Sequence, residues 1–216
     1  MTEEKRNFRL SREAWPRRYE LHFDLDLDRW TAAGRARIAL RLDRAAREIV
    51  LHAVDIDITA ARIDGGPALE SVAYDAEAET ATLRFTAEVA AGERVMAIEW
   101  AGAIRDSLRG LYRSTRGDER YAATQFEAAD ARRAFPCFDE PEYKARFALD
   151  LVHPAGLTAL ANAPLASSED LGGGRRRTRF AETPPISSYL VAFTVGPYEA
   201  TEATATPSGV PVRVWL

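Results

Sequence analysis

The sequence predicts an all-β fold: a large, saddle-shaped antiparallel β-sandwich with one short helix. Three observations lead to this prediction, namely long runs of alternating apolar and polar residues, turn-forming residues about every ten positions, and very little helical periodicity. A chain of 216 residues can bury one sizeable core. Because no linker divides the chain, we expect a single domain over residues 1–216.

The first two strands carry the clearest alternation. Residues 19–27 alternate apolar side chains with Asp, Glu and His, and residues 35–42 alternate apolar side chains with arginine. Successive side chains of a strand point to opposite faces, so each run has a core face and a solvent face. Joined across Asp28–Gly34, the runs predict an antiparallel pair in which carboxylates face arginines.

The other elements follow at short spacing, separated by turns at Gly65–Pro67, Ala91–Gly92 and Leu171–Gly174. The one helix is expected at Ala128–Ala134. The expected strands are Glu48–Leu51, Asp55–Ile63, Thr80–Phe85, Arg94–Trp100, Ala145–Val152, Thr158–Ala161, Arg176–Phe180, Tyr189–Val195 and Val210–Trp215.

Composition narrows the class of protein. The net charge of −4 argues against a nucleic-acid partner, which usually selects a basic surface. Cys137 is the single cysteine, so no intrachain disulfide is possible; we interpret it as a small buried hydrophobe. No apolar run approaches the length of a membrane span, and Met1–Leu10 lacks the apolar centre of a secretory signal. We therefore expect a cytoplasmic protein that contacts no membrane.

Neither a metal site nor a catalytic residue is predicted within this chain. The histidines are His22, His52 and His153, and none is spaced from another as the two histidines of a helical zinc motif are. The sequence also lacks the G-x-S-x-G turn of a serine hydrolase, and Cys137 has no histidine nearby in sequence. We interpret the three histidines as structural or solvated.

Gln125 and Glu127 are the candidate binding residues. If residues 122–127 are extended, both side chains point to one face while Phe126 points into the core. A carboxylate beside a carboxamide suits an ammonium ligand, because the carboxylate supplies charge and the amide oxygen accepts a further N–H. The alternative interpretation is that Glu127 caps the short helix expected at Ala128.

Three segments in order resemble one known family. Residues 110–114 read GLYRS, residues 124–127 read TQFE, and residues 131–141 read ARRAFPCFDEP. They resemble the N-terminal domain of the zinc aminopeptidases of peptidase family M1, which includes aminopeptidase N. The flanking segments at residues 15–19, 161–164 and 183–193 agree, so the resemblance runs from about residue 15 to 200.

The resemblance implies a function as well as a fold. It implies that a thermolysin-like catalytic domain follows this domain and holds the zinc, and that residues 201–216 form the last strand leading toward it. It also implies that Glu127 binds the free α-ammonium of a peptide substrate, and that Gln125 lines the pocket for the first side chain. The H-E-x-x-H zinc motif is absent from these 216 residues, so we expect the chain alone to be inactive.

Four charged residues are expected to support the site. Arg132, Arg133, Asp139 and Glu140 could pair and so fix the loop that carries Glu127. A second hypothesis is a free-standing β-sandwich used for binding or assembly. The two hypotheses differ at the last residues, 210–216, whose apolar side chains favour a domain that packs against a partner domain.

Overall fold

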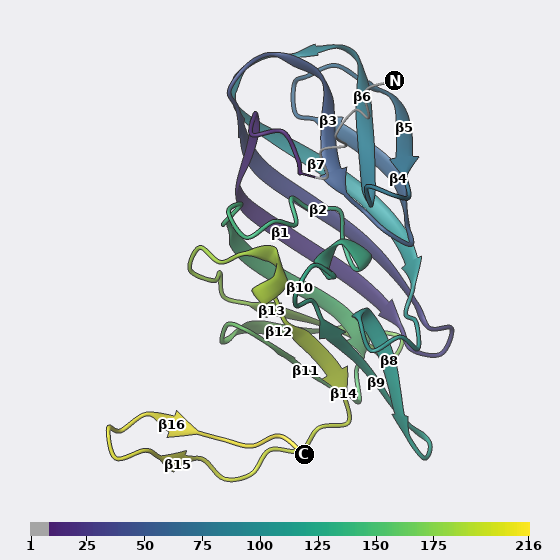
Figure 1. Ribbon diagram of the computed structural model, residues 1–216. Helices are drawn as coiled ribbons and strands as arrows, with labels where there is room; N and C mark the ends of the chain where they lie inside the picture. The colour runs from purple at the N-terminus through teal and green to yellow at the C-terminus, as the bar shows by residue number, and fades with distance from the viewer. Residues whose placement is uncertain (1–8) are drawn as a thin grey trace.

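The computed structural model describes residues 9–216, so residues 1–8 of the amino-terminal stretch lie outside the description (Figure 1). The largest element of the fold is a twisted sheet of seven strands. In spatial order these strands are β12 (Leu165–Gly172), β13 (Arg175–Phe180), β10 (Arg146–Pro154), β1 (Ala14–Asp26), β2 (Thr31–Leu42), β7 (Gly92–Ala103) and β4 (Ile56–Ile63).

Two smaller sheets pack against one face of the large sheet, one near each end (Figure 1). The first has the order β3 (Ala46–His52), β6 (Thr80–Val89) and β5 (Leu69–Asp75). The second has the order β11 (Thr158–Ala161), β14 (Phe193–Gly196), β9 (Glu119–Gln125) and β8 (Gly110–Arg116). The all-β sandwich is therefore confirmed.

The core lies between the large sheet and the two smaller ones. In β1, Tyr19, Leu21, Phe23 and Leu25 are buried, as the alternation predicts. The ring centroid of Phe23 lies 4.9 Å from that of Phe193 in β14, so aromatic packing joins the large sheet to the four-stranded sheet.

The predicted pairing of the first two strands is also confirmed. β1 and β2 run antiparallel, with Glu20 opposite Arg37 and His22 opposite Arg35. The solvent-facing side of this pair is polar, and there Glu20 Oε2 lies 3.8 Å from Arg37 Nε. One pair departs from the antiparallel expectation, since β1 and β10 run parallel.

Several local predictions were wrong. The expected helix at Ala128–Ala134 is only a 3-10 turn, η1 (Ala131–Arg133), and a second one, η2 (Ser188–Leu190), replaces the start of the strand expected at Tyr189–Val195. Strands β5, β8 and β12 were not predicted, and of β9 only residues 122–125 were considered as extended. All eight residues of β12 are exposed, so it lacks the apolar alternation on which strand prediction depends.

The last residues form an extended arm that ends in a two-stranded hairpin, β15 (Thr204–Ala205) and β16 (Pro211–Val212). The single strand expected at Val210–Trp215 is thus much shorter. The large apolar side chains of this arm are exposed, and Leu216 is 72% exposed. No helix in residues 9–216 is long and apolar enough to cross a membrane.

Candidate functional site

The segment between β9 and β10 carries the candidate site, and buried aromatic rings hold it against the core. Phe126 and Phe135 are both buried, and their ring centroids lie 6.0 Å apart. Phe135 also contacts Tyr19 of β1 and Phe147 of β10 edge-on. This apolar packing holds the part of the segment from Phe126 to Phe135 against the large sheet.

The two candidate binding residues are exposed on either side of the buried Phe126. β9 ends at Gln125, and the turn that follows includes Glu127, whose peptide bond to Ala128 is cis. Gln125 Nε2 donates to the backbone oxygen of Glu127 at 3.4 Å. The alternation expected at these three positions is therefore present.

The first turn of η1 does not include Glu127. The turn begins at Ala131, with Asp130 at the N-cap position and no acidic residue in its first turn. The backbone nitrogen of Asp130 donates to the oxygen of Phe126 at 2.9 Å, which closes the tight turn around Glu127. The interpretation of Glu127 as a helix cap is therefore wrong.

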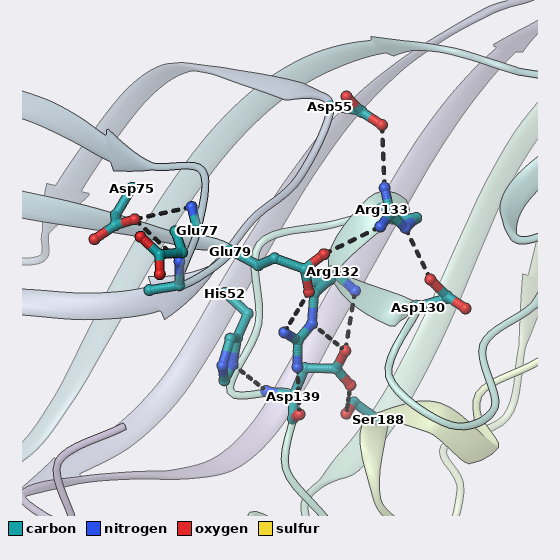
Figure 2. A network of polar contacts seen from close by, with 11 residues as sticks. His52, Asp55, Asp75, Glu77, Glu79, Asp130, Arg132, Arg133, Asp139 and Ser188 are labelled. Carbon is teal, nitrogen blue, oxygen red and sulfur yellow. Dashed lines mark hydrogen bonds and ion pairs between the residues drawn. The ribbon is translucent and has the colours of Figure 1, made fainter. Parts of the chain in front are cut away.

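Arg132 is the centre of an ionic network whose inner pair, Arg132 and Asp139, is buried (Figure 2). Its Nε donates to Asp139 Oδ2 at 3.0 Å, and its Nη2 donates to the backbone oxygen of Asp139 at the same distance. Its Nη1 donates to Glu79 Oε2 at 2.9 Å. The planar guanidinium thus joins η1 to Asp139, farther along the connection to β10, and to Glu79 in the turn before β6.

Arg133 reaches three carboxylates from the next position of the same turn (Figure 2). Its Nε donates to Asp130 Oδ1 at 2.8 Å, its Nη1 to Asp55 Oδ2 at 3.1 Å and its Nη2 to Glu79 Oε1 at 3.1 Å. Because Glu79 accepts from both arginines, it links them into one network.

Asp139 completes the network from the other side. Ser188 of η2 donates its hydroxyl to Asp139 Oδ1, and the backbone nitrogen of Asp139 donates to Nδ1 of the buried His52 at 3.2 Å. The side chain of Asp139 is only 1% exposed. These hydrogen bonds therefore satisfy polar groups of Asp139 that water cannot reach.

Glu140 lies apart from these arginines. Its Oε1 accepts from the backbone nitrogen of Leu10 at 2.7 Å, and its Oε2 lies 3.8 Å from Arg9 Nη1. The structure thus brings together Arg132, Arg133 and Asp139. Glu140 instead binds the backbone of Leu10, in the segment that precedes β1.

Sequence reasoning missed Glu79 and Asp55, which bind the two arginines from distant positions. Both residues adopt positive φ, 56° for Glu79 and 58° for Asp55, in the turns that precede β6 and β4. Asp75 accepts backbone hydrogen bonds from Glu77 and Ala78 and so forms the turn that presents Glu79. An acidic residue in a surface turn gives no local signal of a partner 53 positions away.

Burial sets the protonation of the groups beneath the network. Burial, with a smaller contribution from the Arg132 charge, lowers the pKa of His52 to about 3, so this imidazole is neutral at pH 7 and its Nδ1 can accept a hydrogen bond. Burial also raises the pKa of the Cys137 thiol well above its ordinary value. Cys137 is fully buried, in agreement with the interpretation as a small buried hydrophobe.

The carboxylate of Glu127 is available to a ligand. Within residues 9–216 it makes no ion pair or side-chain hydrogen bond, although two arginines lie five and six positions along the chain. Those arginines are bound by Asp55, Glu79, Asp130 and Asp139 instead. The network therefore holds the turn without neutralising the exposed carboxylate.

Metal ligation has no candidate among the residues that the structure describes. Residues 9–216 contain no group of three or more His, Cys, Asp and Glu side chains that could hold a metal ion. His22, His52 and His153 lie in different surroundings: His22 contacts Asp150, His52 the backbone of Asp139, and His153 the hydroxyl of Thr178.

Comparison with known proteins gives consistent matches over the whole candidate site. The sequence profile of the Peptidase M1 N-terminal domain matches residues 15–190. Aminopeptidase M1-C from Oryza sativa subsp. japonica is 41% identical over 212 residues, covering 96% of this chain and 24% of that protein. The alanine/arginine aminopeptidase of Saccharomyces cerevisiae is 37% identical, covering 95% of this chain and 25% of its own length.

A bacterial relative is covered more fully. Aminopeptidase N from Acetobacter pasteurianus is 32% identical over 205 residues, which covers 93% of this chain and 57% of the relative. The chain therefore spans about a quarter of the length of the plant and yeast relatives and somewhat more than half of the bacterial one.

Proposed function

Because this chain belongs to the peptidase M1 family of aminopeptidases, through the N-terminal domain of that family, we propose that it anchors the free α-amino group of a peptide substrate. Hydrolysis of the first peptide bond is assigned, in this proposal, to a thermolysin-like zinc domain in the part of the relatives that this chain does not cover. The chain alone then has no peptidase activity and binds no zinc. Its partners are the peptide and that catalytic domain.

The observation that carries the proposal is the exposed, unpaired carboxylate of Glu127, which lies on a turn that the arginine network holds through Asp130. A peptide α-ammonium has a pKa near 8 and is largely protonated at pH 7, so it can donate charge-assisted hydrogen bonds to this carboxylate. Gln125 lies beside it, with its carboxamide bonded to the backbone of the same turn. The rigid network beneath the turn supports a fixed position for both side chains.

Anchoring the amine would explain a requirement for a free N-terminus. An acylated N-terminus carries no charge and donates at most one N–H, so it would lose the bond to Glu127. Holding the amine also places the first peptide bond at a set distance from Glu127, and such positioning lowers the entropic cost of reaction. These roles need only binding and orientation by the residues of this chain.

The proposal is tested by Glu127→Gln in the complete enzyme that contains this domain. We expect kcat/KM for dipeptide substrates to fall by about tenfold to a hundredfold, since one hydrogen bond to a charged group contributes roughly 1.5–3 kcal/mol. Zinc content should stay the same. Glu88→Gln is the matched control, because Glu88 is an exposed glutamate on β6 that makes no side-chain hydrogen bond or ion pair within residues 9–216. Equal activity of the two variants would contradict the role of Glu127.

The inactivity of the chain alone needs a separate measurement. The purified 216-residue chain is incubated with an aminoacyl chromogenic amide, with and without added zinc. We expect no turnover in either case. Zinc-dependent turnover that persists through repurification would mean that the chain builds a metal site, and would overturn the division of labour proposed above.

The cytoplasmic location remains part of the same proposal. It rests on the single cysteine, Cys137, which lies buried in the core and forms no disulfide. A fluorescent fusion of the complete enzyme, viewed in its own cell, provides the test.

A further inference from the structure

A small pocket lies between the turn that precedes β4 and the segment that joins β7 to β8. It encloses about 100 Å³, and its charged lining residues are Asp55, Arg105, Arg109 and Arg133. Ser107 lies between Arg105 and Arg109 in the sequence and also lines the pocket. Neither Gln125 nor Glu127 lines it, so this pocket is distinct from the proposed substrate anchor.

Positive charge is in excess in this pocket. Asp55 is the one carboxylate in its lining, and it serves two arginines: it accepts from Arg133 at 3.1 Å and lies 3.7 Å from Arg105. The guanidinium of Arg109 has no ion pair or hydrogen bond within residues 9–216. Glu79 and Asp130 compensate Arg133 from outside the pocket, so the excess charge falls on Arg105 and Arg109.

Arg109 and Arg133 come together because the backbone at Gly110 packs closely against Arg133. Gly110 has φ of +68°, and a Cβ added there would lie only 2.7 Å from Cβ of Arg133. Only glycine fits this contact without a shift, and it places the neighbouring Arg109 against η1. On the other side, the oxygen of Arg105 accepts from the backbone nitrogen of Arg113 at 2.9 Å, which ties the segment to β8.

Hydrogen-bond donors dominate the lining. A guanidinium offers its N–H groups in a planar fork that matches two oxygens of a tetrahedral anion. The hydroxyl of Ser107 now donates to the backbone oxygen of Arg109 at 2.9 Å and can rotate toward a ligand. A volume of about 100 Å³ holds a few water molecules or one small oxyanion, but no larger metabolite.

We propose that this pocket binds a free tetrahedral oxyanion of the phosphate type. Arg109 and Arg105 supply the two guanidinium forks, and Ser107 supplies a neutral donor. Because Arg133 lines the pocket and also belongs to the network beneath Glu127, the bound anion lies directly beside the support of the proposed anchor. The pocket itself requires no peptidase activity, so its test is independent of the proposed function.

The test is calorimetric titration of inorganic phosphate into the full 216-residue chain at constant ionic strength. We expect saturable binding of one phosphate per chain. Arg109→Gln should weaken that binding by about tenfold or more, because a charge-assisted hydrogen bond is lost. The matched control is Arg35→Gln, since Arg35 is an exposed arginine of β2 that lies outside the pocket and has no ion pair within residues 9–216.

Thermal unfolding gives a second readout on the same proteins. Phosphate should raise the unfolding midpoint of the unmodified chain and of Arg35→Gln, and should raise that of Arg109→Gln much less. The absence of saturable phosphate binding would overturn the proposal. Equal binding by Arg109→Gln and the unmodified chain, or an equal loss in both variants, would overturn it as well.

Discussion

Two regions of this molecule are built from arginines and carboxylates, yet they differ in what surrounds the charges. In the network beneath the Glu127 turn, the side chains of Arg132 and Asp139 are 10% and 1% exposed. On the open face of the seven-stranded sheet, the side chains of Arg37 and Glu20 are 48% and 45% exposed. The same residue types therefore form a buried cluster in one place and a solvated surface in the other.

The difference lies in what happens when one partner is removed. A carboxylate freed on the open sheet face returns to water at little cost, and exposed pairs contribute about 0–1 kcal/mol. A carboxylate freed in the buried network keeps its charge without a partner, which costs several kcal/mol. The buried network thus imposes a single arrangement on the loop, whereas the exposed pairs tolerate several.

The largest expected effect comes from Arg132→Gln. Asp139 would lose its ionic partner while remaining buried, so we expect the free energy of unfolding to fall by about 3–5 kcal/mol. Urea unfolding of the variant and the unmodified chain measures this loss. A loss below about 1 kcal/mol would mean that the network behaves like the open sheet face.

A double variant separates the cost of an unpaired buried charge from the cost of lost packing. Asp139→Asn combined with Arg132→Gln removes both charges, so the double variant should lose much less stability than the sum of the two single losses. Additive losses would show that the two side chains do not interact, despite their 3.0 Å contact.

A smaller effect, confined to acidic pH, is expected from His52 beneath the network. Its pKa is lowered to about 3 in the folded chain, against about 6.5 when unfolded, so the unfolded chain takes up the proton first as the pH falls. The contribution of this group should therefore be fully present above pH 6.5 and decline below it by at most about 1.4 kcal/mol per pH unit, which is about 2 kcal/mol at pH 5.

His52→Asn provides the comparison, because Asn keeps an acceptor for the backbone nitrogen of Asp139 but does not titrate. Between pH 6.5 and 5 the stability of this variant should depend less steeply on pH than that of the unmodified chain. Parallel pH profiles in urea unfolding would exclude His52 as a source of the acid sensitivity.

The smallest effect is expected from Arg37→Gln on the open sheet face. Arg37 pairs with Asp64 at 2.8 Å and with Glu20 at 3.8 Å, but all three side chains are at least one third exposed. We expect the free energy of unfolding to change by less than about 1 kcal/mol, and the change to shrink further in high salt. A loss as large as that of Arg132→Gln would remove the contrast between the two regions.

Most of the fold could be predicted from the sequence because alternation is a local property. The residues of β1 and β2 carry their own burial pattern, and the structure gives the predicted antiparallel pair. β12 could not be found in this way, since all of its residues are exposed. The parallel pairing of β1 with β10 joins segments more than 100 residues apart and leaves no local trace.

The sequence alone determined the all-β class, the alternating strands and the exposed positions of Gln125 and Glu127 around the buried Phe126. Each depends on a residue and its immediate neighbours. Only the tertiary structure decided which carboxylates bind the arginines: Glu79 and Asp55 reach them from turns far away in sequence, while Glu140 binds the backbone of Leu10. Charges attract any opposite charge, so the choice of partner is made by which surfaces the packed sheets bring together.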